Sequence, residues 1–403
     1  MSQRYSRRLS PLERLSLVAN EFYHYNADGI VEGIGFIEPG RLEAAVERVA
    51  EANPGLRVRL HGRLGWARWV DSGVAPRVRV LPEADWDGNS EAGAAFMREP
   101  LDALRGGPVA ELLVVPCTDG RTRYVFRGLH AAIDGRSAMH WVMEVFRVLR
   151  GEAPTGTPCT LTDFQLQAQY ADRATPDTSP PVRAIAAVDA GEPDGKPLHF
   201  IWRRIIINRN IGQILPKTAV FLAEYARRRE PGEVGFIIPV DYRGLRTQET
   251  GISNLTGHLR VMVPEGATAW SLMKDLRAQI ASFADCRSMP GGRFVSWIPI
   301  GSLRRRVRPK YDFLHYAPNK VFQTGGLVSM GMSQPDAYSC PGFKAESVMG
   351  VPPAIGKLNV IFMNHRDSVV VCLSAPARYN HRGQFDEMVA AYQRHFSREG
   401  QIA

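Results

Sequence analysis

The sequence is poor in the residues that mark disulfide-rich and metal-binding proteins. Its 403 residues contain five cysteines, at positions 117, 159, 286, 340 and 372, and no two of them form a C-x-x-C pair. Their odd number and wide spacing indicate no disulfide framework, zinc ribbon or redox dithiol. We therefore expect reduced, mostly buried thiols and no metal site.

Long apolar runs and nucleotide-binding motifs are also missing. The longest apolar stretches, such as Val369–Leu373, are far too short to cross a bilayer, and no apolar segment follows the basic N-terminus as a secretory signal requires. The expected location is the cytoplasm. Walker A, G-x-G-x-x-G and G-x-S-x-G patterns do not occur, so nucleotide hydrolysis, Rossmann-type redox chemistry and the α/β-hydrolase fold lack support.

Charge of one sign is in moderate excess. Fifty Lys and Arg against 41 Asp and Glu give a formal net charge of +9. The basic residues are mostly dispersed, Arg227–Arg229 and Arg304–Arg306 being the only triplets, and no nucleic-acid-binding motif accompanies them. Anionic small molecules or an acidic partner protein explain the charge better than nucleic acid does.

Two similar stretches of mixed helix and strand are predicted. Residues 38–52 have helical periodicity, 111–116 and 123–129 read as a hairpin, and 136–149 as an amphipathic helix. Residues 151–197 hold seven prolines and four glycines, after which strands and helices resume. We predict an α/β protein with an N-terminal domain over 1–170, a linker over 171–197 and a C-terminal domain over 198–403.

The sharpest motif is His130-x-x-x-Asp134-Gly135. A predicted strand ends at Leu129 and a helix begins near Arg136, so His130 falls on a strand-to-helix loop, where a rigid scaffold displays reactive groups. A histidine with a near-neutral pKa can accept and return a proton, and Gly135 permits an unusual turn. The motif alone is equally compatible with a structural turn histidine.

These residues resemble the HHxxxDG signature of the chloramphenicol acetyltransferase-like superfamily. That superfamily includes the condensation domains of nonribosomal peptide synthetases, the polyketide-associated acyltransferases and the wax-ester synthases. His130, Asp134 and Gly135 match the signature, and Leu129 replaces its first histidine. Four further stretches resemble family elements, namely Leu42–Arg57, Ile237–Arg243, Ser253–Gly257 and Leu327–Gly331, the last with Met330 where asparagine is usual.

The resemblance implies a fold and an activity. The fold would be two α/β sandwiches forming a V-shaped pseudo-dimer, with His130 in an interdomain tunnel. The activity would be transfer of an acyl group from a thioester of coenzyme A or a carrier protein to a hydroxyl or amine acceptor, in natural-product or lipid biosynthesis. His130 would be the general base, while Asp134, Gly135 and Arg243 would position its loop through an Asp134–Arg243 pair.

The resemblance also implies a tunnel lining and partners. Acyl transfer needs a hydrogen-bond donor for the developing oxyanion, and the matching elements offer Ser253, Asn254, Thr256 and Ser329 as oxyanion or tunnel-lining residues. His258, just after the Ser253–Gly257 turn, is a further candidate for the lining. No tightly bound cofactor is expected: acyl-CoA or a phosphopantetheinyl thioester would be a co-substrate, and an acyl or peptidyl carrier protein a partner.

A second function stays open at this point. Leu129 and Met330 depart from the family pattern, so the chain could also be a degenerate member of the superfamily. Such a protein would keep the fold but act as a binding protein, or would catalyse a reaction other than acyl transfer in the same tunnel.

Overall fold

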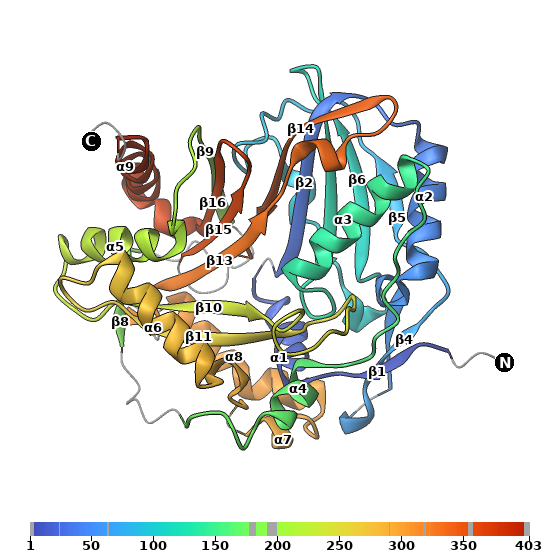
Figure 1. The fold of residues 1–403 in the computed structure, drawn as a ribbon. Coiled ribbons are helices and arrows are strands. Elements are labelled where there is room, and N and C mark those ends of the chain that lie inside the picture. Colours follow the sequence, from blue (N-terminus) through green and yellow to red (C-terminus); the bar gives the residue numbers. More distant parts are fainter. Residues whose placement is uncertain are drawn as a thin grey trace.

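The computed structural model describes residues 4–23, 25–62, 64–176, 183–191, 200–289, 291–316, 320–321, 323–353 and 358–398. Within them, the chain forms two α/β lobes that lie side by side (Figure 1).

The first lobe is built on a five-stranded sheet with the strand order β14-β2-β7-β6-β5. Only the β5–β6 pair is parallel. The helices α2 (Pro39–Ala52) and α3 (Gly135–Leu149) pack on the sheet through apolar side chains at helical spacing, such as Leu42, Val46 and Val49 of α2. The strands are β2 (Asn26–Gly35), β5 (Arg77–Val80), β6 (Ala110–Pro116), β7 (Arg121–Leu129) and β14 (Phe343–Val351).

The second lobe is built on a six-stranded sheet with the order β11-β10-β13-β15-β16-β9. The β10–β13 and β13–β15 pairs are parallel and the others antiparallel. The helices α5 (Ile214–Arg227), α6 (Ala269–Ala281) and α9 (Gln384–Arg398) share one hydrophobic core with this sheet. The strands are β9 (Phe200–Ile207), β10 (Gly235–Asp241), β11 (Thr256–Met262), β13 (Gly325–Met332), β15 (Asn359–Asn364) and β16 (Val369–Pro376).

Smaller elements complete the described chain. A three-stranded sheet has the order β1-β4-β3, and β8 pairs with β12. The remaining α-helices gather below the two lobes in Figure 1. These elements are β1 (Ser6–Arg8), β3 (Val58–His61), β4 (Arg68–Asp71), β8 (Ala184–Ile185), β12 (Lys320–Val321), α1 (Pro11–Ala19), α4 (Asp163–Gln169), α7 (Gly292–Val295) and α8 (Ile300–Tyr316).

Two strands of the second half join the lobes. β14 belongs to the C-terminal half of the sequence but pairs with β2, from Phe343 opposite Gly35 to Val351 opposite Asp28. β16 is buried on both faces: Val371 packs in the core of the second lobe, whereas Val370 and Cys372 pack in the core of the first. β16 therefore contributes side chains to the hydrophobic cores of both lobes.

The predicted two-lobed α/β fold is confirmed, with some elements that the sequence did not indicate. The hairpin and the helix expected around His130 are present as β6, β7 and α3, whereas β2, β14 and α8 were not predicted. The domain boundaries at 170 and 198 stay a prediction, and 177–182 and 192–197 of the predicted linker lie outside the described residues. Within the described part of the chain, the five cysteines are free, and no helix is long and apolar enough to cross a membrane.

Candidate active site

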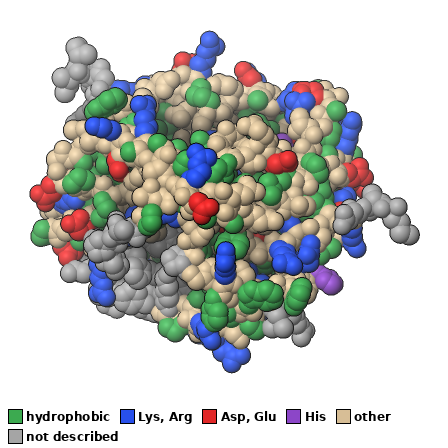
Figure 2. Space-filling model, turned by 60° about the horizontal axis from the view of Figure 1, so that its bottom comes forward, with side chains coloured by type: hydrophobic (Ala, Val, Ile, Leu, Met, Phe, Trp, Pro, Cys, Tyr) green, Lys and Arg blue, Asp and Glu red, His purple; other side chains and the backbone are tan. Residues whose placement is uncertain are grey.

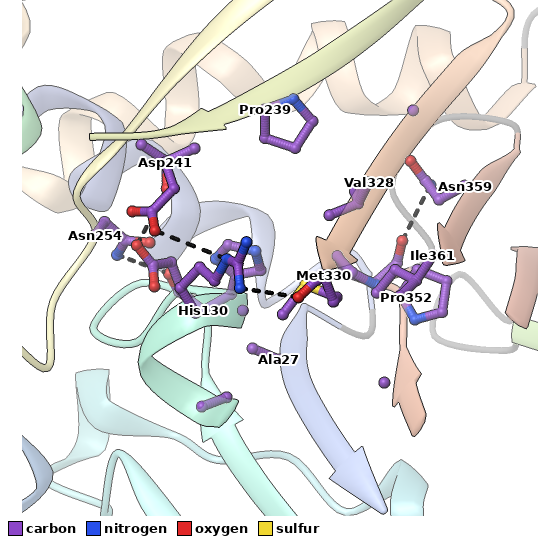
Figure 3. A pocket seen from close by; sticks show the side chains of 18 of the residues that line it. Ala27, His130, Pro239, Asp241, Asn254, Val328, Met330, Pro352, Asn359 and Ile361 are labelled. Atoms are coloured by element: carbon purple, nitrogen blue, oxygen red, sulfur yellow. Dashed lines mark hydrogen bonds and ion pairs between the residues drawn. The ribbon is translucent and has the colours of Figure 1, made fainter. Parts of the chain in front are cut away.

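A cavity of about 290 Å³ opens between the two lobes. The first lobe contributes β2, the loop at His130, the start of α3 and the end of β14, and the second contributes β10, β11, β13 and β15. Leu12 and Ser16 of α1, below the lobes, complete the lining. Figure 3 shows His130 beside Asn254, with Pro239, Val328 and Ile361 on the walls. The cavity therefore brings the His130 loop together with lining residues as distant in the sequence as Leu12 and Ile361.

His130 is held by main-chain and ring contacts. Its N–H donates to the carbonyl oxygen of Tyr25 at 3.1 Å, and its own carbonyl accepts from Nδ2 of Asn254 at 2.9 Å. The imidazole stacks on the Tyr25 ring, with centroids 4.8 Å apart, and its Nδ1 has no hydrogen-bond partner among the described residues. Burial lowers the pKa of His130 below its ordinary value, although its own carbonyl, Asp134 and Asn254 oppose this shift. The imidazole is therefore neutral near pH 7.

The expected pair of Asp134 and Arg243 is present. Oδ2 of Asp134 accepts from Arg243 at 3.0 Å, from the Leu255 N–H at 2.9 Å and from the Thr256 hydroxyl at 3.1 Å. Oδ1 caps α3 by accepting from the Ser137 N–H at 2.8 Å. Burial would raise the pKa of Asp134, but the Arg243 charge and these donors hold it below its ordinary value. The Asp134 carboxylate therefore fixes the His130 loop to the second lobe.

Arg243 and Ser137 add further hydrogen bonds between the start of α3 and the second lobe. Arg243 also contacts Oδ1 of Asp241 at 2.8 Å and donates to the carbonyl oxygens of Gly251 and Ser253, each at 3.0 Å. The Ser137 hydroxyl, 2.9 Å from Arg243, accepts from the N–H of Ser253 at 3.1 Å. The start of α3 is therefore bound to the turn that precedes β11.

Gly135 does not adopt the unusual turn that we expected. It is the first residue of α3 and is not among the glycines with positive φ, so the Asp134 cap alone redirects the chain. A Cβ on Gly135 would lie 3.4 Å from Cε of Met330, at ordinary contact distance. The structure thus places Gly135 on the cavity wall, close to Met330.

The four candidate oxyanion residues have different positions. Ser253 is fully buried and does not line the cavity, which corrects the expectation for this residue. Asn254 and Thr256 line it, but the Asn254 amide donates to His130 and the Thr256 hydroxyl to Asp134. Because a hydroxyl has one hydrogen, Thr256 has none left for an oxyanion. Ser329 lines the cavity and is exposed, and its hydroxyl has no hydrogen-bond partner among the described residues.

An arginine that we did not single out connects the lobes at the cavity. Arg136, the second residue of α3, donates to the carbonyl oxygen of Met330 at 2.8 Å, and its Nε lies 3.7 Å from Oδ2 of Asp241. Its position directly after the His130 motif was the signal available in the sequence. The Met330 side chain replaces the usual asparagine of the family pattern, while its main chain binds Arg136.

A second histidine faces the same cavity. His258 on β11 lines the wall and is exposed to the cavity space. Its removal from bulk water and the nearby His130 lower the pKa of His258 to about 4, so it is neutral near pH 7. Leu129, at the place of the first histidine of the family signature, is instead buried in the core of the first lobe.

No metal site accompanies these side chains: among the described residues, no group of three or more His, Cys, Asp or Glu could hold a metal ion.

The comparisons with known proteins assign the fold. No protein-family model and no curated protein sequence matches the chain. Solved structures that match along 98% of its length include condensation domains and a polyketide synthase-associated protein. The chain thus has the chloramphenicol acetyltransferase-like fold of the condensation domains, as the resemblance implied.

Three of these structures illustrate the similarity. A variant of the starter condensation domain of rhizomide synthetase RzmA, in complex with C8-CoA and Leu-SNAC, has a TM-score of 0.63 at 17% identity, with 93% of its chain covered. The condensation domain of the monacolin K polyketide synthase MokA has a TM-score of 0.59 at 12% identity, with 98% covered. Polyketide synthase associated protein 5 from Mycobacterium tuberculosis has a TM-score of 0.59 at 14% identity, with 97% covered.

Proposed function

We propose that the protein is an acyltransferase that moves an acyl group from a thioester to a hydroxyl or amine acceptor, with His130 as general base. The observation that carries this proposal is the neutral imidazole of His130 on the wall of an interlobe cavity, with its main chain held on both sides. A base must be unprotonated and fixed in position before it can take a proton. The rhizomide synthetase neighbour, which binds C8-CoA and Leu-SNAC, supports a thioester as the donor.

The proposed reaction needs one histidine and no covalent acyl-enzyme. Nδ1 of His130 is enclosed by protein, so Nε2 takes the proton from the acceptor hydroxyl or amine. The acceptor oxygen or nitrogen attacks the thioester carbonyl, and a tetrahedral oxyanion forms. When the oxyanion collapses, the carbon–sulfur bond breaks and the imidazolium returns its proton to the leaving sulfur. Ser329 is the predicted oxyanion residue that lines the cavity and whose hydroxyl has no hydrogen-bond partner among the described residues.

The positive charge of one surface segment supports an acidic carrier protein as the donor of the acyl group. Residues 286–311 contain seven Lys and Arg and no Asp or Glu. Arg305, Arg306, Phe294 and Trp297 of this segment are exposed, and Trp297 lies edge-on to the exposed Trp66 with ring centroids 5.9 Å apart. Figure 2 shows basic and hydrophobic side chains next to one another on the lower part of this face. We name these five residues the basic-aromatic surface and assign to it an acidic carrier protein.

Product analysis tests the proposed function. The purified protein is incubated with acyl-CoA and acyl-carrier thioesters of different chain length and with amine and alcohol acceptors, and products are identified by mass spectrometry. His130→Ala should lower turnover by about 10²–10⁴-fold, the usual contribution of a positioned general base. Donor binding, measured by calorimetry, should change little. His61→Ala, at an exposed histidine at the end of β3, is the matched control and should keep full turnover.

Two results would contradict the proposal. Full turnover of His130→Ala with a substrate that the wild type converts would make His130 a structural residue. Binding of acyl thioesters without any transfer, across the whole acceptor panel, would favour the second function, a binding protein that keeps the fold.

A further inference from the structure

The loop that carries His130 also receives a hydrogen bond from the N-terminal segment of the chain. Nη2 of Arg7, in β1, donates to the carbonyl oxygen of Ala132 at 3.2 Å. Ala132 is fully buried and lies midway between His130 and Asp134. Arg7 therefore contacts the main chain of the loop between the proposed base and the carboxylate that binds the second lobe.

The guanidinium group of Arg7 is held in turn by a buried carboxylate. Its Nη1 donates to Oε1 of Glu13 at 2.6 Å, and neither side chain is more than 1% exposed. Glu13 is the third residue of α1, where its Oε2 accepts from the Ser10 N–H at 2.9 Å and completes a capping box. Hydrogen bonds between charged groups are stronger than those between neutral ones. Glu13 therefore fixes Arg7 between α1 and the His130 loop.

The same carboxylate orients the amide that binds His130. Nδ2 of Asn254 donates to the carbonyl oxygen of His130 at 2.9 Å and to Oε1 of Glu13 at 3.5 Å. An amide NH₂ group has two hydrogens, so it makes both contacts at once. If the amide were turned over, its oxygen would face the carboxylate and be repelled by it. Glu13 therefore keeps the Nδ2 group of Asn254 directed at His130.

We propose that Arg7 and Glu13 are positioning residues for the proposed acyl transfer, because together they hold the His130 loop and so keep the imidazole in place at the interlobe cavity. The proposal rests on His130 as general base and adds two residues of the N-terminal segment to the site. Neither side chain lines the cavity. The pair therefore acts on the rate through the position of His130 and not through substrate binding.

Removal of two comparable ion pairs tests this role. Arg7→Met removes the bond to Ala132. Arg57→Met removes an ion pair with Asp71 of β4, in the same small sheet as β1, and Arg57 contacts no residue of the His130 loop among those described. Both variants should lower the urea midpoint of unfolding. Only Arg7→Met should lower kcat, by about 10- to 100-fold, since a displacement of about 1 Å costs up to about 10²-fold.

The kinetic comparison uses a donor and acceptor that the wild type converts, at a temperature where both variants stay folded. KM should be nearly unchanged in Arg7→Met, because the lost contact positions the base and does not bind substrate. An equal fall of kcat in Arg7→Met and Arg57→Met would make the Arg7–Glu13 pair a structural part of the small sheet and overturn the proposal. Unchanged kcat in Arg7→Met would overturn it as well.

Hydrogen exchange measures the hold on the loop without any substrate. The N–H of His130 donates to Tyr25, and the N–H groups of Ala132 and Ile133 donate to Leu129. These amides should exchange at least about tenfold faster in Arg7→Met, because the loop opens locally more often. They should exchange at the wild-type rate in Arg57→Met, with the amides of β16 as the internal reference. Unchanged exchange in Arg7→Met would contradict the proposal.

A double variant separates positioning from stability. Arg7→Met leaves the Glu13 charge buried without this partner and next to Asp163, whose pKa is raised to about 7 by burial and by that charge. Adding Glu13→Gln removes the buried charge but keeps an oxygen for the Ser10 N–H, so the urea midpoint should recover. kcat should stay low, because Ala132 still lacks the bond from Arg7. Recovery of kcat together with stability would overturn the positioning role.

The conservative variant keeps the proposal testable if Arg7→Met does not fold. Arg7→Lys retains a charge opposite Glu13, but its ammonium group lacks the planar fork that reaches Glu13 and Ala132 together. It should therefore fold, with loop exchange and kcat between those of the wild type and of the double variant. Wild-type exchange and kcat in both Arg7→Lys and the double variant would overturn the proposal.

The positioning proposal and the acyl-transfer proposal fail in different ways. Full turnover in His130→Ala would contradict the general-base mechanism, whereas faster loop exchange in Arg7→Met would still confirm that the pair holds the loop. Lost turnover in His130→Ala, together with unchanged exchange and kcat in Arg7→Met, would remove only the positioning role.

Discussion

Asp134 accepts hydrogen bonds from four groups, and these groups come from both halves of the sequence. Ser137 lies on the helix that Asp134 caps, whereas Arg243, Leu255 and Thr256 belong to the second lobe. A buried carboxylate with this many donors is strongly stabilised in its charged form. The loop that carries His130 is therefore fixed to the opposite lobe by a carboxylate whose Oδ2 already accepts three hydrogen bonds and whose Oδ1 caps α3.

Removing the Asp134 charge should destabilise the protein in a pH-dependent way. Asp134→Asn keeps a capping oxygen but loses the charge opposite Arg243, so the free energy of unfolding at pH 7 should fall by about 1.5–3 kcal/mol. Asp134→Ala, which leaves Arg243 without this partner, should cost about 3–5 kcal/mol. Urea unfolding measures both values, with Asp336→Asn at an exposed carboxylate as the control.

The sign of the pH effect follows from the lowered pKa of Asp134 in the folded state. Its contribution is fully present above the unfolded pKa of about 3.9 and is lost as the pH falls through the lower folded value. The difference between the wild type and Asp134→Asn should therefore be constant near neutral pH and shrink in acid. A difference that grows as the pH falls below about 4 would contradict the assignment.

The pH profile of acyl transfer should reflect the burial of His130. A general base works in its neutral form, so the rate rises with pH through the pKa of the base. Because burial lowers this pKa, the rising limb of kcat/KM should have its midpoint below about 6.5, the ordinary value for histidine. His258 has a pKa of about 4 and stays neutral through this range, so His258→Asn should leave the midpoint in place. A midpoint above 7 would indicate another base.

At the scale of elements, the pairing of β2 with β14 determines how the lobes are joined. Gly33 stands opposite Ala345 in this pair, and the register shifts between Ala345 and Ser347. A Cβ on Gly33 would lie 2.1 Å from the carbonyl oxygen of Lys344 and 2.8 Å from Cα of Ala345. The main chains of the two strands thus approach so closely that only glycine fits.

Gly33→Ala should therefore loosen β14 from the first lobe. The main chain has to move to admit the methyl group, so we expect a loss of about 1–3 kcal/mol of unfolding free energy, the usual cost of overpacking. Hydrogen exchange should show faster exchange in β2 and β14 than in β16. Gly212→Ala is the matched control, because its Cβ would meet nothing within 4 Å and its φ is not positive. An unchanged exchange rate in β14 would show that the strand accommodates the methyl group.

The sequence predicted local elements better than pairings between distant ones. The hairpin of β6 and β7 and the helix α3 have regular apolar periodicity, so the position of the His130 loop between them could be predicted. β2 was missed because eight of its ten residues are buried, including Asp28 and Glu32, and three of the ten are glycine, so it shows no alternation. Its pairing with β14, about 300 positions away, has no local signal.

At the candidate active site, too, residues on one loop were easier to predict than contacts that depend on strand register. His130 and Asp134 share one loop, and the resemblance supplied Arg243. Whether a hydroxyl lines the cavity depends on the register of β11 and its preceding turn, which directs Ser253 inward and Thr256 to Asp134. A second cavity, of about 550 Å³, is lined by five separated segments of the chain, so no single segment could predict it.

At the scale of the whole molecule, the arginine clusters have different surroundings. Arg227 donates to the carbonyl oxygen of Gly232 at 3.2 Å, and Arg229 donates to that of Ala187 at 2.6 Å. Both guanidinium groups therefore bind main-chain oxygens of the second lobe. Arg305 and Arg306 are exposed on α8, within the acid-free segment 286–311. Arg305 and Arg306 are thus less engaged in contacts with the described main chain than Arg227 and Arg229 are.

Charge reversal on this surface should affect a carrier-bound donor and spare an uncharged one. If an acidic carrier protein docks there, Arg305→Glu combined with Arg306→Glu should raise the KM for the acyl-carrier thioester by roughly two- to thirtyfold, since each exposed ion pair contributes about 0.2–1 kcal/mol. Added salt should weaken the wild-type interaction, because exposed charges are screened beyond about 8 Å at physiological ionic strength. The double variant should lose most of this salt dependence.

The acyl-N-acetylcysteamine thioester carries no charge and no carrier, so its KM should be the same for both proteins. An equal KM would show that the active site is intact. Equal KM values with the carrier thioester would mean that the carrier docks elsewhere, and equal effects on both donors would mean that the substitutions disturb the fold of α8 rather than a docking surface.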